Sequence, residues 1–437
     1  MGVISCGTTM LDQGVFKNIG AVTWDTTAKT SGFTAVSGNG YFVNTTSASI
    51  TVTLPASPSA GDIVGIKDYA NTADTNQIVI GRNGSNIQGT ADNYNILVKG
   101  GSALLVYVDG TQGWKVTSAS QASDIIVPEF IVATGGTILT NGDFKTHIFT
   151  GPGTFTVCSA GNPGGSDSVD YLVIAGGAGA SGDRGGGAGA GGFRVSNSVG
   201  CAPAPTMSPL SNPTGIPVSV TGYPITIGSG GAGTPSDGTS GSSSVFSTIT
   251  SAGGGHSLAN GFTAGGSGSG GYASAPGAGG CAGAGNTPPV SPPQGNPGGN
   301  GAGPPGYGAG GGGGAGAAGS NGTGSPIAGG AGGAGSFVAV AFMNPGCAPT
   351  YGEPGPVAST RYFAGGGGGS YFGTAGAGTA GVGGVGGGGD GADRSPKTGE
   401  DGTANTGGGG GGGNQFGGNG LGGDGGSGIV MIRYKFQ

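Results

Sequence analysis

The chain lacks several features on which common protein functions depend. Only 20 acidic and 14 basic residues occur among 437, and they give a formal net charge of −6. A nucleic-acid-binding protein needs clustered lysine and arginine to displace counterions, so we expect no nucleic-acid partner. The apolar runs are a few residues long, far short of the ~18 residues that a transmembrane helix requires.

Catalytic motifs are equally scarce. The only two histidines are His147 and His256, so a zinc motif with two histidines on one helical turn is excluded. His147 lies in a β-prone run and is predicted to be structural. Two carboxylate pairs have the residue types of a glycosidase, namely Asp62 with Asp68 and Asp390 with Asp393. Solvated turn carboxylates are the simpler interpretation, and we expect no enzyme, no metal and no cofactor.

Cysteine is rare and irregularly spaced. The count of five is odd and no CxxC occurs, which argues against a zinc site and a dense disulfide framework. We expect buried or half-buried free thiols, in a protein assembled in a reducing cytoplasm. The cysteines are Cys6, Cys158, Cys201, Cys281 and Cys347.

Glycine, in contrast, is in large excess, with 114 residues against a usual share of about 7%. Residues 1–170 contain 24 of them and residues 171–437 contain the other 90. The composition therefore predicts a conventional globular front and a low-complexity back.

The front has the pattern of an all-β fold. From residue 41 to 120, short β-prone runs alternate with turn residues, including Asn83-Gly84 and a hairpin turn about Asp109-Gly110. No window shows a 3.6-residue period, so almost no α-helix is expected. We predict a small β-sandwich or barrel-like domain over residues 41–120 and a β connector over residues 121–170.

Two apolar β runs bracket the glycine-rich region. Tyr171–Ile174 leads directly into the first glycine block, and Ile429–Tyr434 leaves the last one. We expect these two strands to lie near each other at the base of the region.

Four structures compete for the glycine blocks. Collagen fails because its period of three does not persist. A calcium-binding β-solenoid has a single partial match, Gly388–Pro396, with Ser395 where a large apolar residue belongs. Disorder is the compositional default, but it would leave the bracketing strands beside a flexible chain. Packed polyglycine II-type helices remain: with three residues per turn, they direct every N–H and C=O outward to neighbouring runs.

One segment of the glycine region concentrates aromatic and basic residues. Tyr and Arg are frequent at binding hot spots, which makes this segment a candidate receptor site. The same residues would also serve as caps of glycine runs or as a subunit contact. The candidates are Tyr351, Arg361, Tyr362, Tyr371 and Phe372.

Several motifs resemble the glycine-rich domain of bacteriophage tail-fibre and receptor-binding proteins. The most specific are GTANTGGGGGGG and the closing GSGIVMIRY, and the resemblance covers about residues 144–437. The front, with TLPASPSAGDIVGIKDYANT and LVYVDGTQGWKV, resembles a small β-domain of phage tail fibres.

The resemblance implies a virion tail-fibre protein that attaches the phage to its host. It implies a homo-oligomer, most often a trimer, with residues 1–40 as a virion-attachment segment that binds other tail proteins. Residues 171–437 would be the adhesin domain, whose loops touch a host surface glycan or outer-membrane protein. The alternative is a structural spacer or adaptor that links the tail to a separate receptor-binding protein.

Overall fold

The computed structural model describes residues 22–120, 129–162, 165–198, 207–273, 280–343, 351–372, 378–395, 397–414 and 420–437. It also gives the backbone of a small antiparallel sheet before residue 22, made of β1 (Val3–Ser5), β2 (Thr8–Asp12) and β3 (Val15–Phe16). The chain divides into two compact units, Met1–Val127 and Pro128–Gln437.

The first unit is built from two stacked sheets around one apolar core. In sheet order, the five-stranded sheet consists of β12 (Gly113–Ser120), β11 (Ser102–Asp109), β8 (Ile63–Asp68), β6 (Asn39–Val43) and β4 (Thr23–Lys29). The four-stranded sheet consists of β10 (Tyr94–Ile96), β9 (Ile78–Gly81), β7 (Ile50–Thr53) and β5 (Phe33–Thr34).

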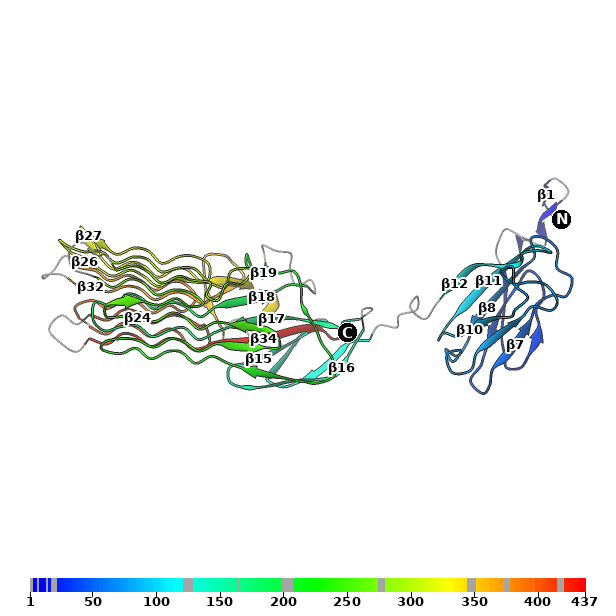
Figure 1. Cartoon of the computed structure of the whole chain (residues 1–437), viewed down its shortest axis with the longest axis horizontal. Helices are drawn as coiled ribbons and strands as arrows, with labels where there is room; N and C mark the ends of the chain where they lie inside the picture. The colour runs from blue at the N-terminus through cyan, green and yellow to red at the C-terminus, as the bar shows by residue number, and fades with distance from the viewer. Residues whose placement is uncertain are drawn as a thin grey trace. The chain divides into compact units, whose positions relative to one another are not determined.

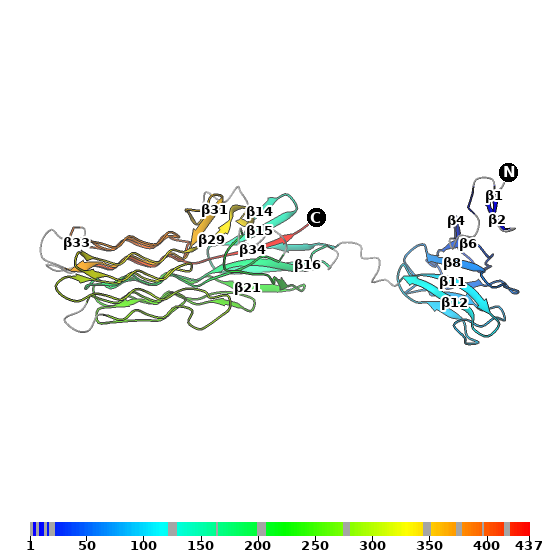
Figure 2. The same cartoon turned by 90° about the horizontal axis from the view of Figure 1, so that it is seen from above.

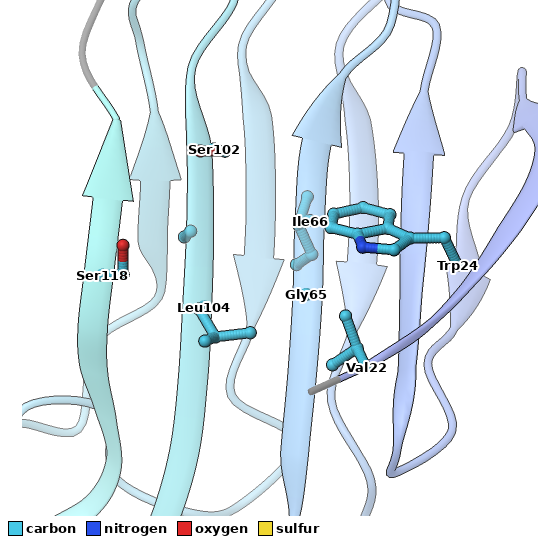
Figure 3. Close-up of a pocket in the computed structure, with 8 residues that line it drawn as sticks. Val22, Trp24, Gly65, Ile66, Ser102, Leu104 and Ser118 are labelled. Atoms are coloured by element: carbon cyan, nitrogen blue, oxygen red, sulfur yellow. The ribbon is translucent and has the colours of Figure 1, made fainter. Parts of the chain in front are cut away.

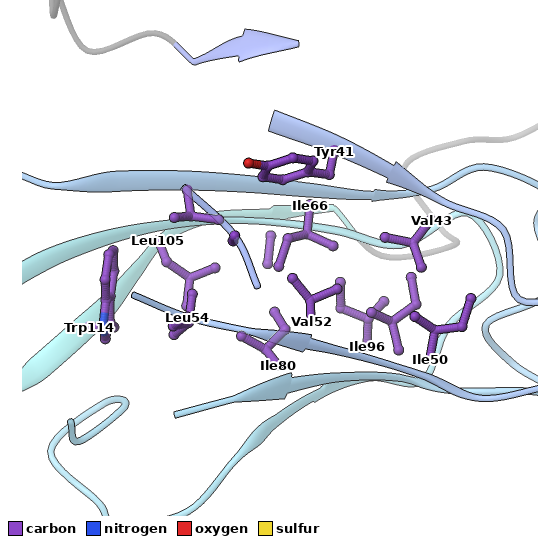
Figure 4. Close-up of a cluster of buried hydrophobic side chains, with 14 of the residues drawn as sticks. Tyr41, Val43, Ile50, Val52, Leu54, Ile66, Ile80, Ile96, Leu105 and Trp114 are labelled. Atoms are coloured by element: carbon purple, nitrogen blue, oxygen red, sulfur yellow. The ribbon is translucent and has the colours of Figure 1, made fainter. Parts of the chain in front are cut away.

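From β4 to β9, successive strands alternate between the two sheets. Among these strands, neighbours within each sheet are therefore parallel. In one sheet β4 pairs with β6 and β6 with β8, and in the other β5 pairs with β7 and β7 with β9. Figure 4 shows the core that the two sheets enclose, with Val52 and Ile66 near its middle and Leu105 beside Trp114 at one end. Two predicted turns are present in this unit. One is at Asn83-Gly84, where both residues have positive φ, and the other joins β11 to β12 in a hairpin.

The second unit has a β base from which the glycine runs extend. Its larger sheet has, in order, β14 (Thr137–Asn141), β15 (Phe144–Phe149), β34 (Ile429–Lys435), β17 (Ser168–Ile174), β18 (Phe193–Ser196) and β19 (Ser211–Asn212). β20 (Ile216–Pro217) pairs with β17. A five-stranded sheet has β13 (Ile131–Thr134), β16 (Gly153–Ala160), β21 (Gly222–Thr226), β22 (Ser244–Phe246) and β23 (Ile249–Ser251).

The bracketing strands pair as predicted. β17 and β34 are antiparallel neighbours with Leu172 opposite Met431. Alternate residues of both strands enter two different cores, one with Leu172 and Met431 and the other with Val173 and Val430. This burial on both faces explains why consecutive residues are apolar or aromatic over Tyr171–Ile174 in β17 and Ile429–Ile432 in β34.

The remaining elements are short. A three-stranded sheet at the base comprises β29 (Ser336–Ala339), β31 (Thr360–Phe363) and β30 (Glu353–Pro354), and α1 (Val340–Met343) follows β29. Three small pairings are β24 (Ser257–Leu258) with β25 (Gly261–Phe262), β26 (Tyr307–Gly308) with β32 (Tyr371–Phe372), and β27 (Thr323–Gly324) with β28 (Ile327–Ala328) and β33 (Gly378–Thr379). With a single four-residue helix in the described part, the all-β prediction is confirmed.

The glycine runs that extend from the β base lie side by side, as Figures 1 and 2 both show. In the run 187–192, consecutive N–H groups donate to three different neighbouring runs and return to the first at every third residue. The donor–acceptor pairs are Gly187 to Gly310, Ala188 to Gly410, Gly189 to Gly255, Ala190 to Gly313, Gly191 to Gly407 and Gly192 to Ala252. A repeat of three residues per turn with no internal hydrogen bond is that of a polyglycine II helix, as predicted.

The carbonyls of the same run serve three further neighbours. They accept N–H groups from runs 265–271, 364–370 and 175–180, so this run has six neighbours in all. Such close packing accommodates methyl groups at a few positions, such as Ala188 and Ala190, and leaves no room for a side chain at most of the glycines. A Cβ on Gly367, for example, would lie 2.0 Å from the carbonyl oxygen of Gly410. The Cα–H of Gly367 that stands in place of this Cβ points at the same oxygen, which is the arrangement of a Cα–H···O contact.

The structural division does not coincide with the boundaries expected at residues 40 and 170. β4 and β5 share the sheets of the 41–120 domain, and β13–β16 share the base sheets of the glycine-rich unit. Most of residues 1–21 of the expected attachment segment lies outside the described residues, as do Cys6, Cys201 and Cys347. Cys158 and Cys281 are free but exposed, so the expectation of burial is wrong for them.

Candidate functional site

One set of the chain reversals between glycine runs lies at the end of the bundle away from β17 and β34. We call this end, with its reversals at residues 183–184, 235–237, 259–260, 303–306 and 325–326, the loop end. Figure 1 shows β24, β26, β27 and β32 there, and Figure 2 shows β33. Because the runs saturate one another with backbone hydrogen bonds, side-chain chemistry concentrates at such reversals.

An aromatic side chain with a cation above it lies at the loop end. The guanidinium carbon of Arg184 is 4.7 Å from the centre of the Phe372 ring, and Tyr307 meets that ring edge-on at 6.2 Å between centroids. All three residues are partly exposed. Tyr371, beside Phe372, is buried, and its carbonyl accepts a 2.8 Å hydrogen bond from the Asn414 amide.

Local backbone geometry positions Arg184. The chain reverses between two glycine runs at Ser181–Arg184, where the Asp183 N–H donates to Ser181 Oγ at 3.3 Å and Arg184 has a φ of 50°. Arg184 Nε lies 3.8 Å from Asp183 Oδ1, with both side chains more than a third exposed. An ion pair so exposed contributes little to stability. The guanidinium is a forked hydrogen-bond donor that lies beside the aromatic surface of Phe372.

The other candidate residues lie at the opposite end of the run, against the β base. Arg361 donates from Nε to the Tyr351 carbonyl at 3.0 Å and from its Nη2 to the Gly352 carbonyl. Tyr362 is 6% exposed and packs on Phe337 with ring centroids 5.4 Å apart. Tyr351 packs against the base core. These contacts are those of structural residues.

The structure therefore does not bring the five candidates together. Residues 364–370 separate the two groups, a span of roughly 22 Å at ~3.1 Å per residue. Sequence reasoning missed Arg184 and Tyr307 as partners of Phe372. The available signal was an arginine that directly precedes a glycine run, in GDRGGG, where a chain reversal had to occur.

The acidic residues on the sides of the bundle have a structural role. Outer runs lack a neighbour on one side, and carboxylates accept the N–H groups left over there. The donor–acceptor pairs are Gly383 to Asp390 at 2.6 Å, Ala380 to Asp393 at 3.2 Å, Asp424 to Asp401 at 2.7 Å and Gly233 to Asp424 at 2.7 Å. Asp390 and Asp393 are exposed, as expected of solvated carboxylates, and each caps an N–H group at the edge of the bundle.

Both histidines are held inside polar contacts of the second unit. His147 is fully buried, with Nδ1 2.7 Å from the Gly135 carbonyl and Nε2 3.0 Å from the Tyr434 hydroxyl. Burial lowers the pKa of His147 and raises the pKa of Tyr434 to about 12. His256 Nδ1 lies 2.8 Å from Ser240 Oγ, and burial lowers its pKa despite the opposing charge of Asp237. These contacts give His147 the structural role predicted for it.

Among the described residues, no group of three His, Cys, Asp or Glu side chains is arranged to hold a metal ion. No helix in that part of the chain has the length and hydropathy to span a membrane.

Comparison with known proteins gives one family. No curated protein matches the chain. The family described as "Glycine-rich domain" matches residues 149–435, which include β17, β34 and every glycine run between them. The chain therefore belongs to the glycine-rich domain family.

Proposed function

We propose that the chain is a virion tail-fibre protein that attaches a bacteriophage to its host cell. The loops at the loop end would contact a surface glycan or an outer-membrane protein. The proposal includes a homo-oligomer, most often a trimer, assembled in the host cytoplasm and bound to other tail proteins through the N-terminal part. It involves no enzymatic activity.

The observation that carries the proposal is the cluster of Arg184, Tyr307 and Phe372 at the loop end. The sides of the bundle are backbone already engaged in internal bonds, so they offer little chemistry that distinguishes one partner from another. Aromatic and arginine side chains supply rigid contact area and directed donors, which is what recognition of a sugar or a protein loop requires. Saturated runs give this cluster a stiff support.

A cell-binding assay tests this proposal. Purified full-length protein carrying Arg184→Gln and Phe372→Ala is compared with wild type for binding to cells of the host strain. Loss of a hot-spot pair costs at least about 2 kcal/mol, so we expect binding to fall more than tenfold. Val220→Ala, at a 65% exposed position in another segment, is the matched control and should bind normally.

Two outcomes contradict the proposal. Normal binding by a double variant that melts like wild type would assign the loop end no recognition role. Absence of any cell binding by the wild-type protein would favour the spacer or adaptor, in which the stiff bundle only joins other tail components. In that case we expect the purified chain to bind a second virion protein instead.

A further inference from the structure

The outer face of the five-stranded sheet in the first unit carries a row of residues in direct register. Trp24 on β4 is opposite Gly40 on β6, Gly40 is opposite Gly65 on β8, and Gly65 is opposite Leu104 on β11. Leu104 in turn is opposite Ser118 on β12. Two glycines thus occupy the middle of a sheet, where glycine weakens a strand and often marks close approach of another group.

Backbone conformation does not require these glycines. Gly40 and Gly65 are absent from the residues with positive φ, so any side chain could adopt their extended backbone. Space does require Gly40, because a Cβ there would lie 2.7 Å from Cδ2 of the Trp24 indole. Figure 3 shows the indole lying over this part of the sheet, with Leu104 further along it. The indole therefore covers Gly40, and Gly65 forms a low floor between Trp24 and Leu104.

The floor opens into a hollow of about 310 Å³ that Val22, Trp24, Gly65, Leu104 and Ser118 help to line. A second hollow of about 180 Å³ also has Ser102 in its lining, together with residues that include Tyr94, Asn95 and Leu97. We call the two together the sheet groove. Trp24 is 42% exposed, so its indole is open to a ligand.

The lining identifies the chemistry of the occupant. None of the residues that line either hollow is charged. A nucleic acid or an acidic glycan would lack the cations that it needs. Aromatic rings present a negative face to polarised C–H groups, and Ser118 and Asn95 supply a hydroxyl and an amide. A pyranose ring has one apolar C–H face and a rim of hydroxyls, which matches both features.

We propose that the sheet groove binds a neutral oligosaccharide, with one sugar ring stacked on Trp24 and the chain continuing past Ser102. This site is separate from the loop end and does not depend on the function proposed there. It adds a second glycan contact, in the first unit.

Tryptophan fluorescence can report on this site alone. The chain has two tryptophans, and Trp114 is fully buried, so acrylamide quenching of the full-length protein reports Trp24. The probes are neutral hexasaccharides built from glucose, galactose or N-acetylglucosamine, with hexagalacturonate as the charged control. At millimolar concentration we expect one of the neutral probes to reduce the quenching constant at least twofold, with saturation, and hexagalacturonate to have no effect.

Two groove variants test the location. Gly65→Val fills the floor, and Leu104→Lys places a charge in the wall; both retain Trp24 as the reporter, and both should abolish protection. If Gly65→Val fails to fold, Leu104→Lys tests the location alone. Val108→Ala, on the same strand at a 46% exposed position outside the lining, should behave as wild type.

Three results would overturn the proposal. The first is that no neutral hexasaccharide protects Trp24. The second is that protection survives in both groove variants. The third is that light scattering shows Leu104→Lys reducing the oligomeric state, because the sheet groove would then join copies of the chain.

Discussion

Replacing Gly367 by alanine tests the packing of the glycine runs directly. Gly367 lies in a run with neighbours on all sides, and its new Cβ would be 2.0 Å from the Gly410 carbonyl oxygen. Ordinary contact requires more than 3 Å, so the Gly410 carbonyl must move by about 1 Å or more. That oxygen accepts the Ala188 N–H at 2.9 Å, and the shift breaks this bond.

The expected cost combines two effects. Overpacking in a tight interior costs about 1–3 kcal/mol, and a lost hydrogen bond costs about 1 kcal/mol, so we expect about 3 kcal/mol. The Pro128–Gln437 unit has 310 residues. At about 2.1 cal/mol/K per residue its unfolding entropy is about 0.65 kcal/mol/K, so Tm should fall by about 5 °C.

Differential scanning calorimetry of the full-length protein measures this shift. The matched control is Gly151→Ala in the same unit, where an added Cβ has no heavy atom within 4 Å. It should leave Tm unchanged or raise it slightly through the unfolded state. A Tm for Gly367→Ala within 1 °C of wild type would refute the six-neighbour packing.

Three further predictions follow from named contacts. Asp390→Ala should cost only about 0.5–1.5 kcal/mol but accelerate hydrogen exchange of the Gly383 amide, whereas Asp390→Asn should retain protection. Asp68→Ala removes the buried acceptor of the Ala73 and Gly100 N–H groups. It should destabilise the first unit by at least about 2 kcal/mol, and Asp68→Asn by less, in urea unfolding followed by tryptophan fluorescence, since both tryptophans lie in this unit. The pKa of both histidines is lowered in the folded state, so the unfolded chain takes up protons at a higher pH than the folded chain does. The free energy of unfolding should therefore fall as pH drops below about 6.5, by at most about 1.4 kcal/mol per pH unit for each histidine. Since residues 1–127 contain no histidine, the first unit's melting transition should not shift between pH 7 and 6, and a shift there would contradict this assignment.

Much of the fold was predictable because local chemistry specifies it. The runs Tyr171–Ile174 and Ile429–Ile432 have apolar or aromatic side chains at every position, and only a strand covered on both faces accommodates them. A block of glycine has no side chain to bury, so its backbone groups need partners in other runs. The Asn83-Gly84 pair predicts a turn with two positive φ values, which is what forms.

The pairing of the strands was not predictable in the same way. Short β runs about ten residues apart, separated by turn residues, suit antiparallel hairpins and alternating parallel sheets equally well. In the first unit, β4, β6 and β8 pair in parallel because each intervening strand crosses to the other sheet. That choice depends on long-range burial of residues such as Val52 and Ile66 in one core. No local pattern records it.

The candidate site failed to emerge from the sequence for a related reason. Proximity along the chain suggested that Arg361 and Phe372 act together. A polyglycine II run, however, is an extended structure with a large rise per residue. A few glycines therefore place its flanking residues at opposite ends of the run. Contacts at the loop end instead join residues far apart in sequence, such as Arg184 and Phe372. Which reversals become neighbours depends on how chemically uniform runs are ordered in the bundle. In such a protein, functional residues are best sought at the run boundaries, sorted by the end at which each run stops.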